Sequence, residues 1–547
     1  MKRGPMKIEV RGHRRDFLRL AGTGLAYAAS AGLPTKTSAE EALGLGPAPD
    51  SIFNVRRFGA LGDGATIDTP AINQAIDAAA AAGGGSVVFP AGTYASYSIH
   101  LKSHVSLYLE SGATILAAST PLDGTTSGGY DAAEPQGDWE PYQDYGHNHW
   151  HNSLIWGEGI HDIAIVGPGI IWGRGLSRGH ETDQDLPPTS KPGVGNKSIA
   201  LKNCHNVILR DFSILAGGWF GILATGVDNL TIDNLKIDTN RDGIDVDCCK
   251  NVHISNCSVN SPWDDGICPK SSLALGYARA TENVTIASCY VTGDYQLGTM
   301  LDGTFRRFGP DFKRNATGRI KFGTESNGGF KNITVSNCVF EGCRGLALET
   351  VDGGICEDIA ITNITMRDIR NAPLFLRLGT RLRGPKGTAV GKLRRVLISN
   401  LSSWGALPEI CSLITGVPGY PIEDIKISDV YLHQAGGGTQ AMAGVNPPEK
   451  ENDYPEPASF GTLPASGFFL RHVKNIELSS VEIATESPDH RPAFWLQDVQ
   501  GSDFFRVKTG RGRPAATFLL HDVEDFRVSG CRDVKDTILE RVGQQEM

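Results

Sequence analysis

Eight segments of alternating polar and apolar residues recur along this chain. Each starts with a polar residue, continues as a short run with apolar residues at every second position, and often ends in Asn-Cys or a similar pair. The starts are Asn229, Asn251, Asn283, Asn332, Asp358, Arg395, Asp424 and Asn475. Alternation with a period of two places Val, Ile and Cys on one face of each strand. One such strand cannot bury its apolar face alone, whereas stacked turns build a continuous core.

The spacing of these repeats favours a solenoid over a β-sandwich. Successive starts lie between 22 residues (229 to 251) and 51 residues (424 to 475) apart, and the shortest interval fits one turn of a three-sided coil. A sandwich would show turns about every 8 to 12 residues. We therefore expect an all-β, right-handed parallel β-helix. Cys257, Cys289 and Cys338 share one motif position and are expected to be buried between neighbouring turns.

A short capping helix is expected before the repeats. Thr69-Pro begins a segment with a capping residue, Pro at the first helical position, and apolar residues at Ile72 and Ile76. Three glycines at 83–85 end the helix, and Ser86 begins the first regular strands. The first turn of a β-helix has unpaired backbone groups at its open edge. We expect the helix to cover that edge.

The composition fits one large domain with many turns. The 547 residues include 66 Gly, and no stretch after the first forty has 18 consecutive apolar residues, so no membrane-spanning helix is expected in the mature chain. No interdomain linker is evident. We expect one β-helix domain over 50–535, a C-terminal tail at 536–547, and a surface excursion at 438–466 that contains five Pro. We expect a monomer.

The N-terminus has the pattern of an export signal. Residues 1–39 place a basic segment before a weakly apolar run that ends in small residues, and Arg14-Arg15 followed by Asp-Phe-Leu resembles a twin-arginine signal. Cleavage after Ala31 and cleavage after Ala39 both fit. The alternative is a basic arm or an uncleaved anchor. We expect export to the periplasm or the extracellular space.

The charge of the mature chain argues against nucleic-acid binding. The formal net charge is −9 for the whole chain and becomes −15 without residues 1–39. Phosphate binding requires a concentrated basic face. Binding of an anionic substrate would therefore depend on individual Lys or Arg side chains that offset the acidic field locally.

Three aspartates are expected to meet on one face of the β-helix. Asp242 lies seven residues after Leu235, and Asp264 lies seven after Cys257, where Leu235 and Cys257 are equivalent positions of consecutive repeats. This places Asp242 and Asp264 in one column, roughly 4.8 Å apart in backbone spacing, and Asp265 adds a third carboxylate. Like charges this close raise at least one pKa, as a general acid requires. The spacing alone also fits a Ca²⁺-binding or solvated Asp ladder.

Four segments carry a family resemblance that spans nearly the whole mature chain. They are Phe53-NVRRFGALGDGATIDTPAINQAID, Gly83-GGSVVFPAGTY, Asn240-Arg-Asp-Gly-Ile-Asp and Trp263-Asp-Asp-Gly-Ile-Cys. The first two resemble the entry segment of pectin-degrading β-helix enzymes. The last two resemble the two acidic motifs of the polygalacturonase-like glycoside hydrolases (family 28).

The resemblance implies specific roles for the three aspartates. Asp264 would be the acid that protonates the glycosidic oxygen, while Asp242 and Asp265 would activate the water that attacks with inversion. It also implies a pectic oligo- or polysaccharide substrate, no cofactor and no metal.

The chain departs from the family pattern in its substrate-binding residues. Family members carry Gly-His-Gly on the next turn, where this chain has Tyr295 or Gln296 in place of the histidine, and Arg-Ile-Lys on the turn after. In the family, the Arg and Lys of this segment hold the substrate and form its clamp. Here the sequence after Arg319-Ile-Lys321 fits the turn of the missing histidine. In that register Glu349 takes the place of the clamp lysine. In the alternative register Arg319 and Lys321 are the clamp. In both, they share one face and can meet a sugar carboxylate or a neighbouring Glu.

Aromatic and imidazole side chains near the predicted cleft have several interpretations. Trp219 and Trp263 precede cleft strands and can stack on sugar rings, with loop packing as the alternative. His147, His149 and His151 alternate and can project together from a strand. Metal binding, hydrogen bonding to substrate and simple surface exposure all fit the three histidines.

The sequence therefore predicts an exported hydrolase of α-glycosidic bonds in polygalacturonate, rhamnogalacturonan or another substituted pectin. A Ca²⁺-dependent β-helix polysaccharide lyase and a non-catalytic carbohydrate-binding β-helix are the alternatives. Loops at 120–150, 304–316 and 438–466 are long enough to close the ends of a cleft, which favours exo action.

Overall fold

The eight repeats pair with one another as consecutive turns of one parallel sheet. Their first apolar residues pair in the order Leu230, Val252, Val284, Ile333, Ile359, Val396, Ile425 and Ile476. All eight side chains are buried. The parallel β-helix is confirmed, and the eight repeat strands pair in the register expected from the sequence.

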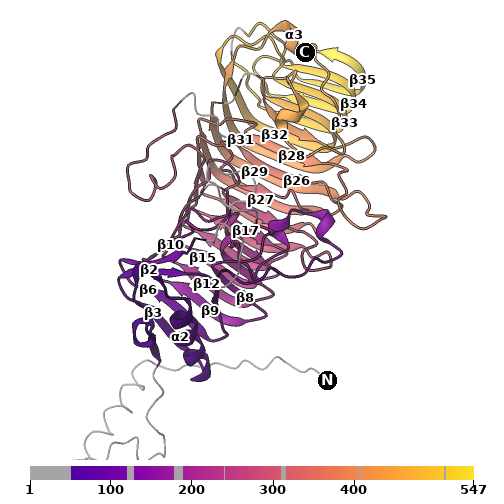
Figure 1. Cartoon of the computed structure of the whole chain (residues 1–547). Helices are drawn as coiled ribbons and strands as arrows, with labels where there is room; N and C mark the ends of the chain where they lie inside the picture. Colours follow the sequence, from indigo (N-terminus) through magenta and orange to yellow (C-terminus); the bar gives the residue numbers. More distant parts are fainter. Residues whose placement is uncertain are drawn as a thin grey trace, which may run out of the picture. The chain divides into compact units, whose positions relative to one another are not determined.

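The computed structural model describes residues 51–119, 129–177, 189–239, 241–309, 316–405, 407, 409–510 and 513–547. Residues 51–547 form one compact unit. Its turns stack from α2 (Thr69–Ala81) at one end to β35 (Thr537–Glu546) at the other (Figure 1). The predicted signal at 1–39, and parts of the predicted loops 120–150 and 304–316, lie outside the described residues. In the part of the chain that the structure describes, no helix has the length and apolar character needed to cross a lipid bilayer.

The turns contribute strands to three parallel faces. The cleft sheet contains β5 (Ile99–His100), β8 (Ile155–Glu158), β11 (Lys197–Lys202), β14 (Phe220–Thr225), β17 (Asp242–Asp247) and β20 (Ile267–Lys270), and continues through β23 (Lys321–Phe322), β26 (Leu346–Thr350), β28 (Leu374–Leu378) and β30 (Ser412–Thr415). The ladder sheet contains β1 (Ile52–Asn54), β3 (Gly85–Phe89), β6 (Val105–Leu109), β9 (His161–Val166), β12 (His205–Arg210), β15 (Asp228–Asp233), β18 (Lys250–Ser255), β21 (Thr281–Ala287) and β24 (Phe330–Ser336).

The third face consists of short strands, and longer strands replace them toward the C-terminus. The short strands are β2 (Asp63–Ile67), β4 (Gly92–Ser96), β7 (Ala113–Ala117), β10 (Ile170–Trp172), β13 (Ser213–Leu215), β16 (Lys236–Asp238), β19 (Ser258–Asn260), β22 (Tyr290–Thr292) and β25 (Val339–Glu341). The long strands are β27 (Ile355–Arg367), β29 (Lys392–Trp404), β31 (Ile422–Gly436), β32 (Phe468–Ser487), β33 (Phe494–Phe505) and β34 (Phe518–Ser529). These long strands continue the ladder sheet. Some of them also pair with strands of the other two faces, as β27 does with β25 and β32 does with β30.

One hydrophobic core runs through the inside of the turns, from Val55 to Val528. Cys257, Cys289 and Cys338 are 1 to 2% exposed within it, as predicted from their shared motif position. None of the eleven cysteines forms a disulfide. The three cysteines at the shared motif position therefore act as small apolar groups between turns.

A ladder of polar side chains explains why the repeats begin with Asn. The backbone is left-handed at every repeat start, with φ between 53° and 61° at Asn229, Asn251, Asn283, Asn332, Asp358, Arg395, Asp424 and Asn475. Asn adopts this conformation more readily than most residues. The amides also bond between turns: Asn251 Nδ2 donates to Asn229 Oδ1 at 3.2 Å, and Asn283 Nδ2 donates to Asn251 Oδ1 at 3.0 Å.

The predicted capping helix is α2, and it covers the N-terminal turn. Its buried residues Ile72, Ala75, Ile76 and Ala79 face the core, and it contacts β1, β3, β5 and β6. The helix thereby shields the edge that the first turn would otherwise expose. Among the described residues of the N-terminal half, 3₁₀ turns lie in loops at η2 (Val55–Phe58), η3 (Glu140–Tyr142) and η4 (Tyr145–His147).

One C-terminal segment differs from the prediction. Residues 536–547 are not a tail, because β35 pairs antiparallel with β34 and extends the domain to the C-terminus. An added antiparallel strand gives the last turn partners for its edge hydrogen bonds. The excursion at 438–466 contains α3 (Gln440–Ala443) and η5 (Pro457–Phe460) and buries apolar side chains such as Leu463 against the β-helix.

The ladder can be tested at Asn283, where φ is 57°. A β-branched residue is strained in this conformation by about 1 to 2 kcal/mol, whereas Gly is not. Both Asn283→Val and Asn283→Gly lose the amide bonds to Asn251 and Asn332. We expect Asn283→Val to have the lower free energy of unfolding of the two, measured by urea denaturation. Equal stabilities would contradict the role assigned to the left-handed backbone.

Candidate active site

A cleft of about 500 Å³ lies beside the cleft sheet. Its lining includes Asp242, Asp264, Asp265 and Lys321, four of the residues predicted for the site. The other lining residues are Asp144, Tyr145, His147, Trp219, Arg241, Lys270, Thr324, Glu325, Arg383 and Tyr454. The structure therefore brings the three predicted aspartates together, with charged neighbours that the sequence did not identify.

The column of the aspartates differs from the prediction by one residue. Asp238 pairs with Asn260, 22 residues later, but Ile244 pairs with Ile267, 23 residues later. One extra residue in the intervening turn makes Asp265, rather than Asp264, the counterpart of Asp242. Gly243 N, next to Asp242, accordingly donates to Asp265 O at 3.0 Å.

The three carboxylates remain close despite this shift. One oxygen from each of Asp242, Asp264 and Asp265 lies within 4.8 Å of the other two. The backbone N–H of Asp265 donates to Asp242 Oδ1 and to Asp264 Oδ1, both at 3.0 Å. The side chains differ in access: Asp264 is 26% exposed, against 5% for Asp242 and 3% for Asp265. Asp264 is therefore the carboxylate that an incoming ligand can reach most easily.

The surroundings drive the pKa values of the buried pair in opposite directions. Burial, reinforced by the charges of Asp245 and Asp264, raises the pKa of Asp242 well above its usual value. Burial also acts to raise the pKa of Asp265, but the charges of Lys321 and Arg319 outweigh it and hold that pKa below its usual range. Asp242 thus favours the neutral form and Asp265 the ionised form.

Arg319 and Lys321 lie on the turn directly after Asp265. Ile267 pairs with Ile320, and Lys321 pairs with Ala347 on the following turn. This is the register in which the Arg-Ile-Lys segment takes the turn of the missing histidine. Arg319 Nε lies 3.1 Å from Asp265 Oδ1, and Lys321 Nζ lies 3.1 Å from Asp265 Oδ2.

Glu349 lies behind these two cations rather than in the cleft. Its oxygens are 3.5 Å from Arg319 Nη2 and 3.7 Å from Lys321 Nζ, and its side chain is fully buried. Burial raises the pKa of Glu349 to about 7, against the opposing charges of Lys321 and Arg319. Neither Glu349 nor Arg319 lines the cleft, so both act on a ligand only through Asp265 and Lys321.

Gln296 and Trp263, predicted to bind substrate, also lie outside the cleft lining. Gln296 Nε2 donates to the carbonyl of Arg307 at 3.1 Å. Trp263 packs edge-to-face against Phe308, with ring centroids 5.5 Å apart. Loop packing accounts for both side chains. Trp219, in contrast, lines the cleft.

A buried charge network under the aspartates was missed by the sequence analysis. Lys270 Nζ lies 3.5 Å from Asp245, 3.7 Å from Asp242 and 3.5 Å from Glu325. Burial raises the pKa of Asp245 to about 7, although Lys270 opposes the shift. Strand alternation offered a signal, because Ile244 and Val246 face the core and therefore turn Asp245 to the cleft side.

The three alternating histidines do not act together. His147 lines the cleft, with Nδ1 3.6 Å from Glu325, and burial lowers its pKa to about 4. His149 pairs with Glu140 at 2.9 Å, and His151 pairs with Glu158 at 2.9 Å. The predicted common projection from a strand is wrong, because His147 ends η4 and no strand covers 147–151.

Two loops far apart in the sequence contribute the remaining cleft residues. Arg383 Nη2 pairs with Glu325 at 2.8 Å. Tyr454, from the excursion at 438–466, accepts hydrogen bonds at its Oη from Lys321 Nζ and Thr324 Oγ1, both at 2.9 Å. No local sequence motif predicts that either residue lines the cleft. On the opposite side, the Arg241 guanidinium lies 4.5 Å from the ring centre of Trp219 and its Nε is 3.3 Å from Asp264.

Two overlapping groups of cleft residues have donor atoms close enough for a metal ion. They are Asp242 with Asp264 and Asp265, and Asp242 with His147 and Asp245. Lys270 already lies within 3.7 Å of Asp242 and Asp245 and supplies positive charge there. The arrangement fits acid–base chemistry without a metal.

Comparisons with known proteins agree with this fold. Residues 52–153 match the model described as rhamnogalacturonase A/epimerase, pectate lyase-like, and residues 197–365 match the right-handed β-helix region. A probable polygalacturonase from Vitis vinifera is 23% identical over 460 residues, which cover 78% of this chain and 84% of that protein. The chain resembles the polygalacturonases. The resemblance seen in the sequence is therefore confirmed.

Solved structures support the same polygalacturonase-like fold. The crystal structure of a hyperthermoactive exopolygalacturonase from Thermotoga maritima superposes with a TM-score of 0.54 at 17% identity, covering 91% of this chain and 96% of that chain. At this identity the likeness concerns the fold, a right-handed β-helix. A shorter match joins this chain to plasmin and fibronectin-binding protein A of Streptococcus pneumoniae, 40% identical over 194 residues, which cover 34% of this chain and 24% of that protein.

Proposed function

We propose that this protein is an exported glycoside hydrolase that cleaves α-glycosidic bonds in pectic polysaccharide. The observation that carries the proposal is the trio of Asp242, Asp264 and Asp265, whose carboxylate oxygens lie within 4.8 Å in one cleft. Glycoside hydrolysis uses one carboxylic acid to protonate the leaving oxygen and one carboxylate to activate water. The three residues offer both protonation states side by side.

Asp264 is the proposed general acid. Its side chain is the most exposed of the three, so it can contact a glycosidic oxygen in the cleft. Asp242 lies next to it, and its raised pKa favours a neutral carboxyl group. A proton held by Asp242 is thus next to Asp264, and Asp264 can deliver a proton to the leaving oxygen.

Asp265 is the proposed general base. The nearby cations Arg319 and Lys321 keep it ionised, as removal of a proton from water requires. The resemblance alone assigned this role to Asp242 as well. Because burial favours the neutral form of Asp242, we assign the base to Asp265 and a proton-sharing role to Asp242.

We propose inversion at the anomeric carbon. The spacing of the oxygens is shorter than the roughly 6.5 to 9.5 Å between carboxyl groups of many inverting enzymes. A retaining mechanism, however, needs a carboxylate free to form a covalent bond to the sugar. Asp265 is 3% exposed and held by two cations, and Asp242 is 5% exposed, so neither fits that role.

The substrate is proposed to carry carboxylates. Lys321, Arg241 and Arg383 line the cleft beside its own carboxylates, and each can offer a positive charge to a sugar carboxylate in a chain whose net charge is negative. Galacturonate-containing pectin fits this distribution, and the N-terminal match to the rhamnogalacturonase A/epimerase model keeps rhamnogalacturonan among the candidates. Tyr145 and Tyr454 enter the cleft from separate loops, which supports exo action.

A second candidate function is ligand binding without catalysis. The match to the pneumococcal plasmin and fibronectin-binding protein A favours it, because that relative is named for binding. The cleft argues for hydrolysis, since a binding surface has no need of a buried, ionised Asp265 beside a neutral Asp242.

The proposed activity is tested with Asp264→Asn on a panel of polygalacturonate, rhamnogalacturonan and methylated pectin. We expect the wild type to release reducing sugar from at least one of them, with the new hemiacetal formed by inversion in proton NMR. Loss of the general acid should lower kcat by about 10²-fold or more. The control Asp503→Asn changes an exposed aspartate on β33 and should retain activity.

Other outcomes of this panel contradict the proposal. Products that absorb ultraviolet light would identify a lyase. Binding without turnover by the wild type would favour the second candidate function, and full activity of Asp264→Asn would remove Asp264 from its role.

The base is tested by the pH dependence of kcat/KM in Lys321→Met. In the wild type the cations hold the pKa of Asp265 below its usual range, so activity persists as the pH falls toward that pKa. Without Lys321 this pKa rises, and the acidic limb of the profile should move to higher pH by about one unit or more. Tyr454→Phe removes the hydrogen bond to Lys321 but no charge. The acidic limb of its kcat/KM profile should stay at the pH of the wild type. If the acidic limb of Lys321→Met lies at the same pH as that of the wild type, Asp265 is not the general base.

Export is proposed from the sequence of residues 1–39 alone. If Arg14-Arg15 is a twin-arginine signal, replacing both with Lys should leave the precursor in the cytoplasm of a bacterial host. Cell fractionation and the mass of the mature N-terminus measure this. Undiminished export of the double variant would contradict the twin-arginine assignment.

A further inference from the structure

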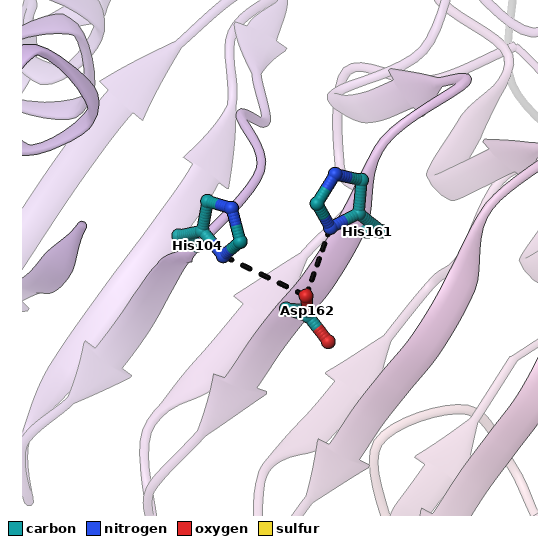
Figure 2. A group of neighbouring side chains, drawn as sticks. All are labelled: His104, His161 and Asp162. Carbon is teal, nitrogen blue, oxygen red and sulfur yellow. Dashed lines mark hydrogen bonds and ion pairs between the residues drawn. The ribbon is translucent and has the colours of Figure 1, made fainter. Parts of the chain in front are cut away.

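Two histidines and an aspartate meet on the outer surface of the N-terminal turns, and none of the three lines the cleft. His104 directly precedes β6, and His161 and Asp162 begin β9 on the next turn. The backbone ties the two turns together here, because His104 N donates to His161 O at 3.1 Å. Figure 2 shows both imidazoles turned toward the carboxylate of Asp162.

The donor atoms of the three residues have the spacing of a metal site. His161 Nδ1 lies 2.8 Å and His104 Nδ1 lies 3.6 Å from the same oxygen, Asp162 Oδ2. One donor atom from each residue lies within 4.8 Å of the other two. Bonds of about 2.0 to 2.1 Å to a tetrahedral ion would place donors about 3.4 Å apart. The side chains need only small movements to reach that spacing.

The neighbours of this cluster hold it in place without occupying it. Asn206 Nδ2 donates to Asp162 Oδ1 at 2.8 Å, which leaves Oδ2 for the histidines. The ring of His205 stacks on His161, with centroids 4.9 Å apart and planes 17° apart. In known metal sites, contacts of this kind between the ligands and the residues around them fix the orientation of the ligands. The side chains remain 36 to 53% exposed, so an ion can enter and water can complete its coordination.

Asp162 begins the polar ladder of these N-terminal turns. Asn206, Asn229 and Asn251 follow it in the amide ladder, each bonded to the residue before it. An amide would satisfy this ladder at position 162 as it does on the later turns. A carboxylate at position 162 places negative charge between two imidazoles. Two imidazoles and one carboxylate are a donor set that suits a transition metal.

The other groups of possible metal ligands among the described residues are less available. Glu134, His151 and Glu158 also lie within range of one another. Lys202 Nζ already pairs with Glu158 at 2.9 Å, and Glu134 accepts the backbone N–H of Trp150. The groups in the cleft contain Asp242, next to Lys270.

We propose that His104, His161 and Asp162 form a binding site for Zn²⁺ or a chemically similar divalent transition metal. Two imidazole nitrogens and one carboxylate suit Zn²⁺, Ni²⁺ or Cu²⁺, whereas Ca²⁺ and Mg²⁺ prefer oxygen ligands. The ion joins two consecutive turns next to the capping end of the β-helix. Because an ion that binds the folded chain stabilises it, the site acts as a clamp on these turns.

Calorimetric titration of the full chain, without a histidine tag, tests this site. We expect binding of one Zn²⁺ at this site and no comparable binding of Mg²⁺ or Ca²⁺. His104→Ala and His161→Ala should each weaken Zn²⁺ binding at least tenfold and abolish the rise in melting temperature that Zn²⁺ produces. His253→Ala removes an exposed histidine elsewhere on the ladder sheet and should bind as the wild type does.

Zn²⁺ binding at this site does not depend on the proposed hydrolase activity. Asp264→Asn should bind Zn²⁺ as the wild type does, because Asp264 belongs to the cleft. Circular dichroism without metal should show the same fold for all variants, since the altered side chains are exposed. Absence of Zn²⁺ binding in the wild type, or equal binding in the double variant His104→Ala/His161→Ala, would overturn the proposal.

Discussion

The parallel pairing of consecutive turns is the constraint on which the rest of this structure depends. Backbone hydrogen bonds fix the separation of neighbouring turns at about 4.8 Å. Residues that are far apart in the sequence therefore become lateral neighbours, as Ile267 and Ile320 do. The amide ladder, the stacked cysteines, the aspartate trio and the His104–Asp162 cluster all follow from this one spacing.

The cleft adds a second requirement, because it buries charges next to the apolar core. Lys270, Lys321 and Arg319 are 2 to 6% exposed at their side chains, and each lies within 3.5 Å of at least one carboxylate. Removing one partner of a buried pair costs about 3 to 5 kcal/mol, since the remaining charge is left uncompensated. The same network fixes opposite protonation preferences on Asp242 and Asp265. Stability and the proposed chemistry therefore rest on the same ion pairs.

Features set by the repeat could be predicted from the sequence, and features set by loops could not. The register of the repeats, the capping helix and the three aspartates follow from periodicity and local motifs. The single extra residue between Asn260 and Ile267 moved Asp265 into the column of Asp242, which a count of residues per turn cannot foresee. Tyr454 and Arg383 return to the cleft from distant loops, with no local signal. Gln296 and Trp263 face loop partners instead, because the insertion that follows them supplies its own contacts.

The central claim is that Asp264, with Asp242 sharing its proton, meets a glycosidic oxygen while Asp265 stands on the water side of the bond. A crystal structure of the Asp264→Asn variant with a bound galacturonate oligosaccharide tests it most directly. The account predicts a glycosidic oxygen within hydrogen-bond distance of side chain 264 and a sugar carboxylate beside Lys321, Arg241 or Arg383. An oligosaccharide bound outside the cleft, or bound in it with no glycosidic oxygen near position 264, would contradict the account.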